Sequence, residues 1–250
     1  MLISPEGLAS LCTYVIDEKV TIDPEATRIY MNGEDLNWEF NVEHLAAHPK
    51  KFELIWANTD RPFTWIMFSA LRHNLLHVYA VNSEVTDPIV TRIPLGFKHP
   101  EMLAPNAPGG RNILCYMNVG GYMDKFIAHK TARVLRDVCR QTFEGCVWVT
   151  KENNVNQNKF YERMMKSKFV LCPMGVGMDT WRFYEAAWYG ATPIVLHSAL
   201  DDLYEKFGAL IVNKWSDVTK ELLELCDPRR RPVAKSVFNI SEYIPNADIV

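Results

Sequence analysis

Two charged residues three positions apart, Arg182 and Glu185, follow a glycine-rich segment that contains Gly175 and Gly177. In a helix this spacing places both side chains on one face. Asp179 precedes them and is expected to cap the helix, whose amino end attracts anions. The segment therefore predicts a site for a phosphorylated ligand, with an arginine for the phosphates and a carboxylate for sugar hydroxyls.

A salt-bridged helix after an ordinary glycine turn would give the same residue pattern. A dinucleotide-binding loop is disfavoured, because Thr180 stands where that motif needs its third glycine. A nucleotide-binding loop of the ATPase kind is disfavoured as well, because the segment lacks the lysine of that loop. The choice therefore lies between a structural helix and a phosphate site of another kind.

The elements that would position this segment alternate in type along the C-terminal half. Apolar runs predict strands over residues 113–117, 146–150, 169–172, 193–195 and 210–212. The residues between them favour helices. Such alternation predicts a parallel sheet covered by helices on both faces, which is a Rossmann-like domain.

Residues 167–195 resemble the donor-binding signature of exostosin-like glycosyltransferases. In that signature a Ser-Lys-Phe strand leads into a Pro-Gly loop, then an arginine, a Glu-Ala pair, and a glycine before Pro-Ile-Val. The positions that fit this order are Ser167, Lys168, Phe169, Pro173, Gly175, Gly177, Asp179, Arg182, Glu185, Ala186, Gly190, Pro193, Ile194 and Val195. Looser similarity over 56–60, 93–96 and 210–215 extends the resemblance to most of the chain from Phe52 onward.

The resemblance implies an enzyme that transfers a sugar from a UDP-sugar to a glycan or glycoprotein acceptor, with inversion at the sugar carbon. UDP-xylose is the favoured donor, because the chain is similar to exostosin-like xylosyltransferases of chlorella viruses; UDP-hexoses and UDP-glucuronate remain open. The Asp-x-Asp motif that holds a metal in another large class of glycosyltransferases is absent from the sequence. We therefore expect no metal or other cofactor, so Arg182, the loop amides and the helix end would meet the charge of the leaving diphosphate.

Two other functions stay open at this point. One is a non-catalytic module that binds carbohydrate or nucleotide. The other is a different nucleotide-dependent α/β enzyme.

A second loop is expected to contact the donor. Asn118 and Gly120 follow the strand predicted over 113–117 and would bring backbone close to the ligand, although an ordinary turn would have the same sequence. Lys130 lies in the helix that comes next, where many relatives have an arginine, and is expected to add a further contact.

Asp60 is the candidate base that would deprotonate the acceptor hydroxyl. It follows an apolar strand predicted over 52–57, and active sites of α/β proteins lie at the carboxyl ends of strands. An aspartate that only caps a turn is the alternative. Asp87 and His73 are the reserve candidates.

The predicted fold class is α/β and GT-B-like, with two Rossmann-like domains that face a central cleft. Residues 1–98, with strand candidates over 28–31, 52–57 and 76–81, would form the acceptor-side domain. Prolines and glycines predict a linker over 99–110. Residues 111–226 would bind the nucleotide sugar, and residues 227–250 would form a tail that returns to the first domain.

The composition is ordinary for a soluble globular protein, with 48% hydrophobic and 23% charged residues among 250. The net charge of −3 offers no basic stripe for nucleic acid. The six cysteines lack metal-ligand spacing and are expected to be buried free thiols, which favours a reducing compartment. No apolar run reaches transmembrane length, and residues 1–20 carry acidic residues where a signal peptide needs an apolar core. Exostosin-like enzymes of the secretory pathway usually have an N-terminal membrane helix, so we expect either a cytoplasmic protein or a sequence from which such a helix was removed. The short length resembles virus-encoded exostosin-like enzymes.

Overall fold

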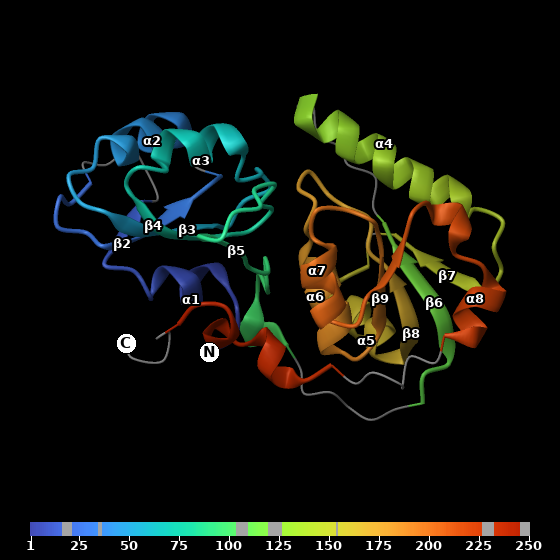
Figure 1. The fold of residues 1–250 in the computed structure, drawn as a ribbon. Helices are drawn as coiled ribbons and strands as arrows, with labels where there is room; N and C mark the ends of the chain where they lie inside the picture. Colours follow the sequence, from blue (N-terminus) through green and yellow to red (C-terminus); the bar gives the residue numbers. More distant parts are fainter. Residues whose placement is uncertain are drawn as a thin grey trace. The chain divides into compact units, whose positions relative to one another are not determined.

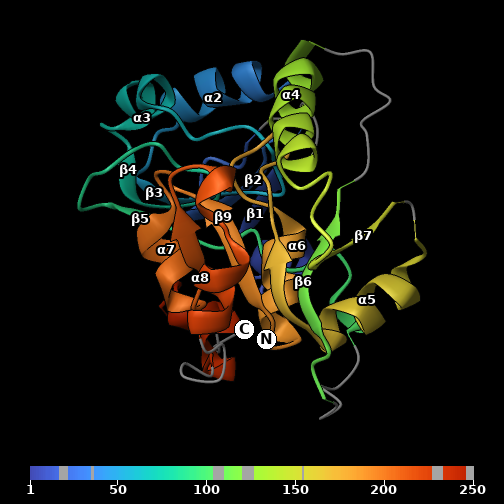
Figure 2. The same cartoon turned by 90° about the vertical axis from the view of Figure 1, so that its right-hand side faces the viewer.

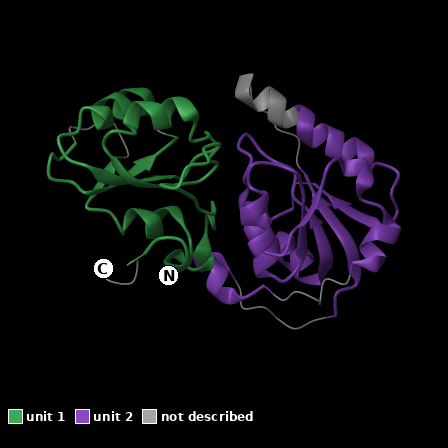
Figure 3. Cartoon of the chain, viewed as in Figure 1, with its two compact units in different colours: residues 1–100, 238–250 green, residues 101–237 purple. Residues whose placement is uncertain are grey.

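The computed structural model describes residues 1–16, 22–34, 37–103, 110–119, 127–153, 155–226 and 233–245, with the side chains of the helix at 127–142 described from Val134 onward. The chain divides into two compact units (Figure 3). Unit 1 comprises residues 1–100 and 238–250, and unit 2 comprises residues 101–237. Each unit has its own sheet of parallel strands.

The sheet of unit 1 follows the order of the chain. Its described strands, in the order in which they pair, are β1 (Tyr14–Ile16), β2 (Arg28–Asn32), β3 (Phe52–Ala57), β4 (Leu75–Ala80) and β5 (Val90–Arg92) (Figure 1). Right-handed crossovers that advance in one direction place their helices on one face of a sheet. The helices α2 (Trp38–Ala46) and α3 (Trp65–Leu71) accordingly share a face, and α1 (Pro5–Ala9) lies on the other (Figure 1).

The strands of unit 1 form where the sequence has apolar runs. Every residue of β3 except Glu53 is buried, which is typical of a parallel strand covered on both faces. The prediction of a strand over 52–57 is confirmed. Those over 28–31 and 76–81 are confirmed to within one residue at each end. β1 and β5 have three residues each and were not predicted.

The C-terminal segment from Phe238 belongs to unit 1. The backbone N–H of Ile3 donates to the Phe238 carbonyl over 3.0 Å, and that of Ile240 donates to the Met1 carbonyl over 3.0 Å. The Phe97 and Phe238 rings stack with their centroids 5.7 Å apart. The first and last described segments of the chain therefore pair within one unit.

The sheet of unit 2 departs from the order of the chain. Its described strands pair in the order β10 (Leu210–Val212), β9 (Thr192–Leu196), β8 (Ser167–Leu171), β6 (Ile113–Asn118) and β7 (Val149–Glu152), all of them parallel. Its described α-helices are α4 (Ile127–Thr142), α5 (Gln157–Lys166), α6 (Trp181–Trp188), α7 (Asp201–Lys206) and α8 (Lys220–Leu225) (Figure 2). The first strand, β6, thus lies between the second and the third.

Alternate residues of β6 face two helical layers. Cys115 and Met117 lie in a buried cluster with Cys139 of α4. Tyr116 faces the other layer, where its ring centroid is 6.2 Å from that of Phe160 in α5. Because α4 and α5 cover opposite faces, the sheet is buried on both sides, as the apolar runs predict.

The predicted elements of unit 2 are confirmed, with one correction at β7. The strand predicted over 146–150 begins only at Val149, because the N–H of Val149 donates to the Cys146 carbonyl in a turn that leaves Val147 99% exposed. Gly190 follows α6 with a φ of +75°, a conformation that favours glycine and ends the helix as predicted. All six cysteines are free thiols, as predicted, but of the six only Cys115, Cys139 and Cys172 are buried.

The two parallel sheets are consistent with the predicted Rossmann-like α/β fold, while the GT-B arrangement stays a prediction. None of the helices in the described ranges is long and apolar enough to cross a bilayer.

We expect Gly96→Ala to destabilise the protein by about 2–4 kcal/mol. The φ of Gly96 is +77°, and an added Cβ would lie 2.3 Å from the carbonyl oxygen of Ile3, so the substitution adds backbone strain to a steric clash. Urea unfolding followed by circular dichroism measures the change. Gly145→Ala is the matched control, because no heavy atom of the described residues lies within 4 Å of the Cβ it would add. Equal unfolding midpoints for the two variants would contradict the packing of the amino-terminal segment.

Candidate donor site

The strand order of unit 2 reverses at β6, and this reversal locates the candidate site. The chain passes from β6 to β7 on one side and then returns to β8 on the other side of β6. Loops that follow two such strands diverge at their carboxyl ends and leave a crevice, which is where open α/β sheets bind ligands. Asn118 ends β6, and the glycine-rich segment follows β8. The sequence motif and the topology therefore point to the same edge of the sheet.

The loop of residues 173–178 is held by backbone hydrogen bonds at its start and within its turn. The N–H of Cys172 donates to the Ile194 carbonyl over 2.9 Å, which continues the pairing of β8 with β9. The N–H of Gly175 donates to the Gly177 carbonyl over 3.1 Å. Both glycines are buried.

Asp179 faces the protein interior. Its carboxylate accepts hydrogen bonds from the hydroxyls of Tyr184, at 2.5 Å, and Tyr204, at 3.2 Å, and from the N–H of Thr180, at 2.9 Å. The side chain is 1% exposed. Thr180, not Asp179, is the N-cap of α6, so the predicted cap was wrong by one residue. The buried carboxylate joins the end of the loop to α6 and α7.

Arg182 has buried N–H groups that no described residue accepts. Its Nε and Nη1 atoms are inaccessible to solvent and lack an acceptor among the described residues. The guanidinium lies 5.9 Å from the centroid of the Phe160 ring. Leaving a buried donor unsatisfied costs about 1–3 kcal/mol. An anionic ligand that accepts from these groups would remove that cost.

The charge of Arg182 acts on two thiols beside the loop. Burial raises the pKa of Cys139 and of Cys172 to about 12, and the guanidinium of Arg182 opposes that rise in both. These thiols therefore stay protonated and apolar at neutral pH, and they contribute no negative charge to the site.

Glu185 is oriented by two residues of α5. Its Oε1 accepts from the Tyr161 hydroxyl over 3.0 Å and from Nε2 of Gln157 over 3.5 Å. The glutamate is 7% exposed. Burial and the neighbouring carboxylate raise the pKa of Tyr161, which keeps its hydroxyl available as a donor. α5 thus fixes the carboxyl group of Glu185, which lies on α6 three residues after Arg182.

The second predicted loop is described only in part. Asn118 ends β6 and pairs in register with Glu152 of β7. Gly120 lies outside the described residues, and so does the side chain of Lys130, although its backbone belongs to α4. Of this group, the structure therefore places only Asn118 at the carboxyl edge of the sheet.

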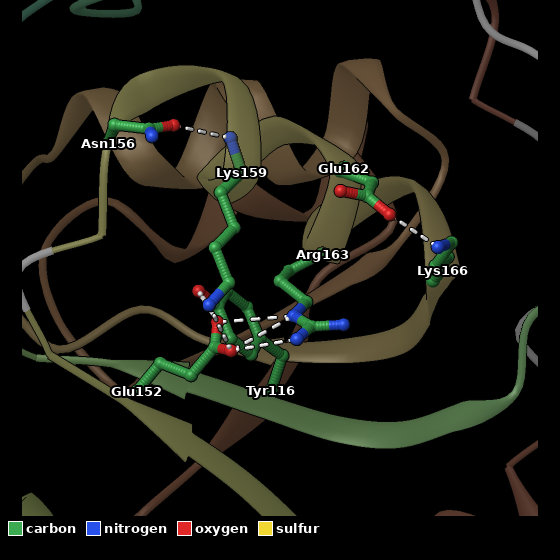
Figure 4. A network of polar contacts seen from close by, with 7 residues as sticks. All are labelled: Tyr116, Glu152, Asn156, Lys159, Glu162, Arg163 and Lys166. Atoms are coloured by element: carbon green, nitrogen blue, oxygen red, sulfur yellow. Dashed lines mark hydrogen bonds and ion pairs between the residues drawn. The ribbon is translucent and has the colours of Figure 1, made fainter.

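Glu152 anchors a polar network at the same edge that the sequence did not reveal (Figure 4). Its carboxylate accepts from Nε and Nη2 of Arg163, with a shortest distance of 2.9 Å, and from the Tyr116 hydroxyl over 3.2 Å. Nζ of Lys159 lies 3.4 Å from Oε1 of Glu152. The hydrogen bonds from Arg163 lower the pKa of Glu152. This network fastens α5 to β7, and so supports the helix that holds Glu185.

Asp60 lies in unit 1, in a turn at the carboxyl end of β3. Its N–H donates to Oε1 of Glu34 over 2.7 Å, and the Thr59 hydroxyl donates to the same oxygen over 3.0 Å. Asn58 starts the turn with a φ of +51°, a conformation that asparagine tolerates better than most residues. The turn is therefore fixed by a second carboxylate, which the sequence analysis did not single out.

The two alternative candidates for the base, His73 and Asp87, lie in other turns than Asp60. His73 precedes β4, and its Nε2 lies 3.0 Å from the Ala46 carbonyl, at the amino end of the sheet. Asp87 precedes β5, and its Oδ1 accepts from the N–H of Ile89 over 3.0 Å. Both therefore serve turns that lead into strands.

In the described part of the chain, no group of three or more histidine, cysteine, aspartate or glutamate side chains is arranged to hold a metal ion.

Comparison with known proteins relates the part of the chain that carries this site to one family model, and a short stretch of the chain to a xylosyltransferase. Residues 125–207 match the family model described as RXYLT1 C-terminal domain. Over 48 residues the chain is 35% identical to ribitol-5-phosphate xylosyltransferase 1 of Homo sapiens; these residues are 19% of this chain and 11% of that protein. The match to the family model covers about a third of the chain and includes all of residues 167–195. The segment that holds Arg182 and Glu185 is therefore similar to the C-terminal domain of the RXYLT1 family, which supports its resemblance to exostosin-like glycosyltransferases.

Proposed function

We propose that the protein is a glycosyltransferase that moves a sugar from a UDP-sugar to a glycan acceptor. The observation that carries this proposal is Arg182, whose buried Nε and Nη1 lack an acceptor among the described residues at the point where the sheet reverses. The similarity of residues 125–207 to the RXYLT1 C-terminal domain supports the same activity.

In this proposal Arg182 binds the diphosphate of the donor. A guanidinium offers planar, charged donors that match phosphate oxygens, and such hydrogen bonds are stronger than neutral ones. As the bond between the sugar and the diphosphate breaks, negative charge grows on the leaving oxygen, and a fixed positive charge stabilises it. Glu185 accepts a hydrogen bond from a hydroxyl of the ribose or the donor sugar, with its orientation held by Tyr161.

Asp60 is the proposed base. It takes the proton of the acceptor hydroxyl while the oxygen attacks the anomeric carbon, and the bond to the UDP oxygen breaks as the new bond forms. A single displacement of this kind inverts the configuration at that carbon. The hydrogen bond from the Asp60 N–H to Glu34 would hold the base in place during the step. This role requires the two units to bring Asp60 to the donor during turnover.

The favoured donor is UDP-xylose, in line with the xylosyltransferase named for the human relative. A panel of nucleotide sugars, tested for slow hydrolysis without acceptor, would identify the donor. Calorimetry with UDP and with NAD separates this proposal from a nicotinamide-dependent enzyme, and transfer of sugar separates it from a non-catalytic binding module.

Arg182→Ala is expected to reduce donor turnover by about a hundredfold or more, because it removes the main side-chain charge near the diphosphate. The folded state should survive, since the buried Nε and Nη1 have no acceptor among the described residues to lose. Donor hydrolysis and UDP calorimetry measure the effect. Arg140→Ala is the control, because Arg140 lies on α4 in an exposed pair with Asp137. Near-normal turnover in Arg182→Ala would refute the phosphate assignment.

Asp60→Asn is expected to retain UDP affinity but to lose about a hundred- to ten-thousandfold in transfer rate, the usual cost of removing a general base. The asparagine has nearly the same shape, and the hydrogen bond from the backbone N–H to Glu34 does not depend on the side chain. Transfer to acceptor and UDP calorimetry should be measured on the same preparation. Asp87→Asn serves as control. A transfer rate close to that of the parent protein would place the base elsewhere, and Glu34 would be the next candidate.

Activity is expected to survive treatment with EDTA, because Arg182 and the amino end of α6 are proposed to meet the charge of the leaving group. The measurement is the initial rate of transfer before and after chelation, with EDTA removed by dialysis in a parallel sample. A complete loss of rate that manganese restores would contradict the metal-independent mechanism.

A further inference from the structure

We propose that Arg136 of α4 is a positioning residue for the donor loop, and that residue 175 is a glycine because Arg136 occupies the adjacent space. The inference rests on the proposed function only in assigning phosphate binding to the loop of residues 173–178. The contacts of Arg136 with that loop are independent of the ligand.

Arg136 reaches the loop at two adjacent residues. Its Nε donates to the carbonyl of Met174 over 3.3 Å. A Cβ added to Gly175 would lie 3.0 Å from Nη2 of Arg136, and the next nearest atom would be Cγ2 of Thr180 at 4.0 Å. The guanidinium therefore holds one peptide of the loop and packs beside the next residue.

The backbone of Gly175 does not itself require glycine. Among the described glycines, those with positive φ are Gly96, Gly190 and Gly208. Gly175 adopts a conformation open to other residues, so its constraint is space, and Arg136 fills that space. A sequence pattern alone would assign this glycine to close contact between backbone and ligand.

α4 is a firm base for this contact. Cys139, one turn beyond Arg136, is fully buried in the core of unit 2, so the helix cannot shift without disturbing that core. On the opposite side, Asp179 joins the end of the loop to Tyr184 of α6 and Tyr204 of α7. Arg136 thus supplies the contact from one helical layer, and Asp179 supplies contacts from the other.

This arrangement makes the effects of Arg136 and Gly175 depend on each other. An alanine at 175 must displace the Arg136 guanidinium and so weaken its bond to the Met174 carbonyl. If Arg136 is already absent, the same alanine meets, among the described residues, only Thr180, at an ordinary contact distance of 4.0 Å. Residues that share one contact give non-additive effects in a double-mutant cycle.

The test compares the parent protein with Arg136→Met, Gly175→Ala and the double variant. Methionine keeps an unbranched apolar side chain and removes every donor. Two readouts are needed: amide hydrogen exchange of residues 174–178 without ligand, and calorimetry with UDP. Arg140→Met and Gly145→Ala are the controls, because Arg140 is exposed on the same helix and Gly145 has open space beside it.

We expect each single variant to speed exchange of the loop amides and to weaken UDP binding by about tenfold, roughly the effect of one lost charged hydrogen bond. The urea midpoint should stay within error of that of the parent protein. The double variant should exchange its loop amides no faster, and bind UDP no more weakly, than Arg136→Met. The proposal would be overturned if the losses of UDP affinity in the two single variants added up in the double variant. It would also be overturned if Arg136→Met left amide exchange in the loop unchanged.

The two readouts keep this inference separate from the proposed function. If the parent protein fails to bind UDP but the exchange data show the coupling, the positioning role stands and the donor assignment falls. Arg136→Lys separates charge from position. If this variant binds UDP as tightly as the parent protein while amide hydrogen exchange of residues 174–178 stays as fast as in Arg136→Met, Arg136 acts through its charge alone. That result would overturn the positioning role.

Discussion

The pairing of β6 with both β7 and β8 is the constraint on which the candidate donor site depends. Because β6 comes first in unit 2 and lies inside the sheet, the chain must leave it on one side and return on the other. Helices of right-handed crossovers then fall on opposite faces. α4 from one layer and α6 from the other therefore reach the same loop, which places Arg136 and Arg182 around it although they lie far apart in the sequence.

Tyrosine hydroxyls serve the buried carboxylates on both sides of Arg182. Asp179 accepts from Tyr184 and Tyr204, and Glu185 accepts from Tyr161. A neutral hydroxyl satisfies a buried carboxyl group without adding a cation, and Nε and Nη1 of Arg182 have no acceptor among the described residues. An arginine held in a buried ion pair could leave that pair only at a high cost. Because tyrosine hydroxyls donate to Asp179 and Glu185, Arg182 is not needed as their ion-pair partner.

The sequence predicted those elements whose signal is local. The strands over 52–57 and 210–212 match residue for residue, because parallel strands covered on both faces are continuous apolar runs. The apolar residues around Val147 made the predicted strand begin three residues before β7 does, because Val147 lies in a turn and is exposed. The sequence could not predict the direction of side chains. Asp179 faces the interior because it accepts a hydrogen bond from Tyr204, which is distant in the sequence. Arg136 was missed because one sequence does not say which face of α4 meets the loop.

The return of residues 238–245 to unit 1 sets the order in which the protein can mature on the ribosome. Phe238 and Ile240 pair with the first residues of the chain, yet they are synthesised after the whole of unit 2. Domains generally fold as units during synthesis. All residues of unit 2 are therefore synthesised before the segment from Phe238, which pairs with Ile3 and stacks on Phe97 in unit 1.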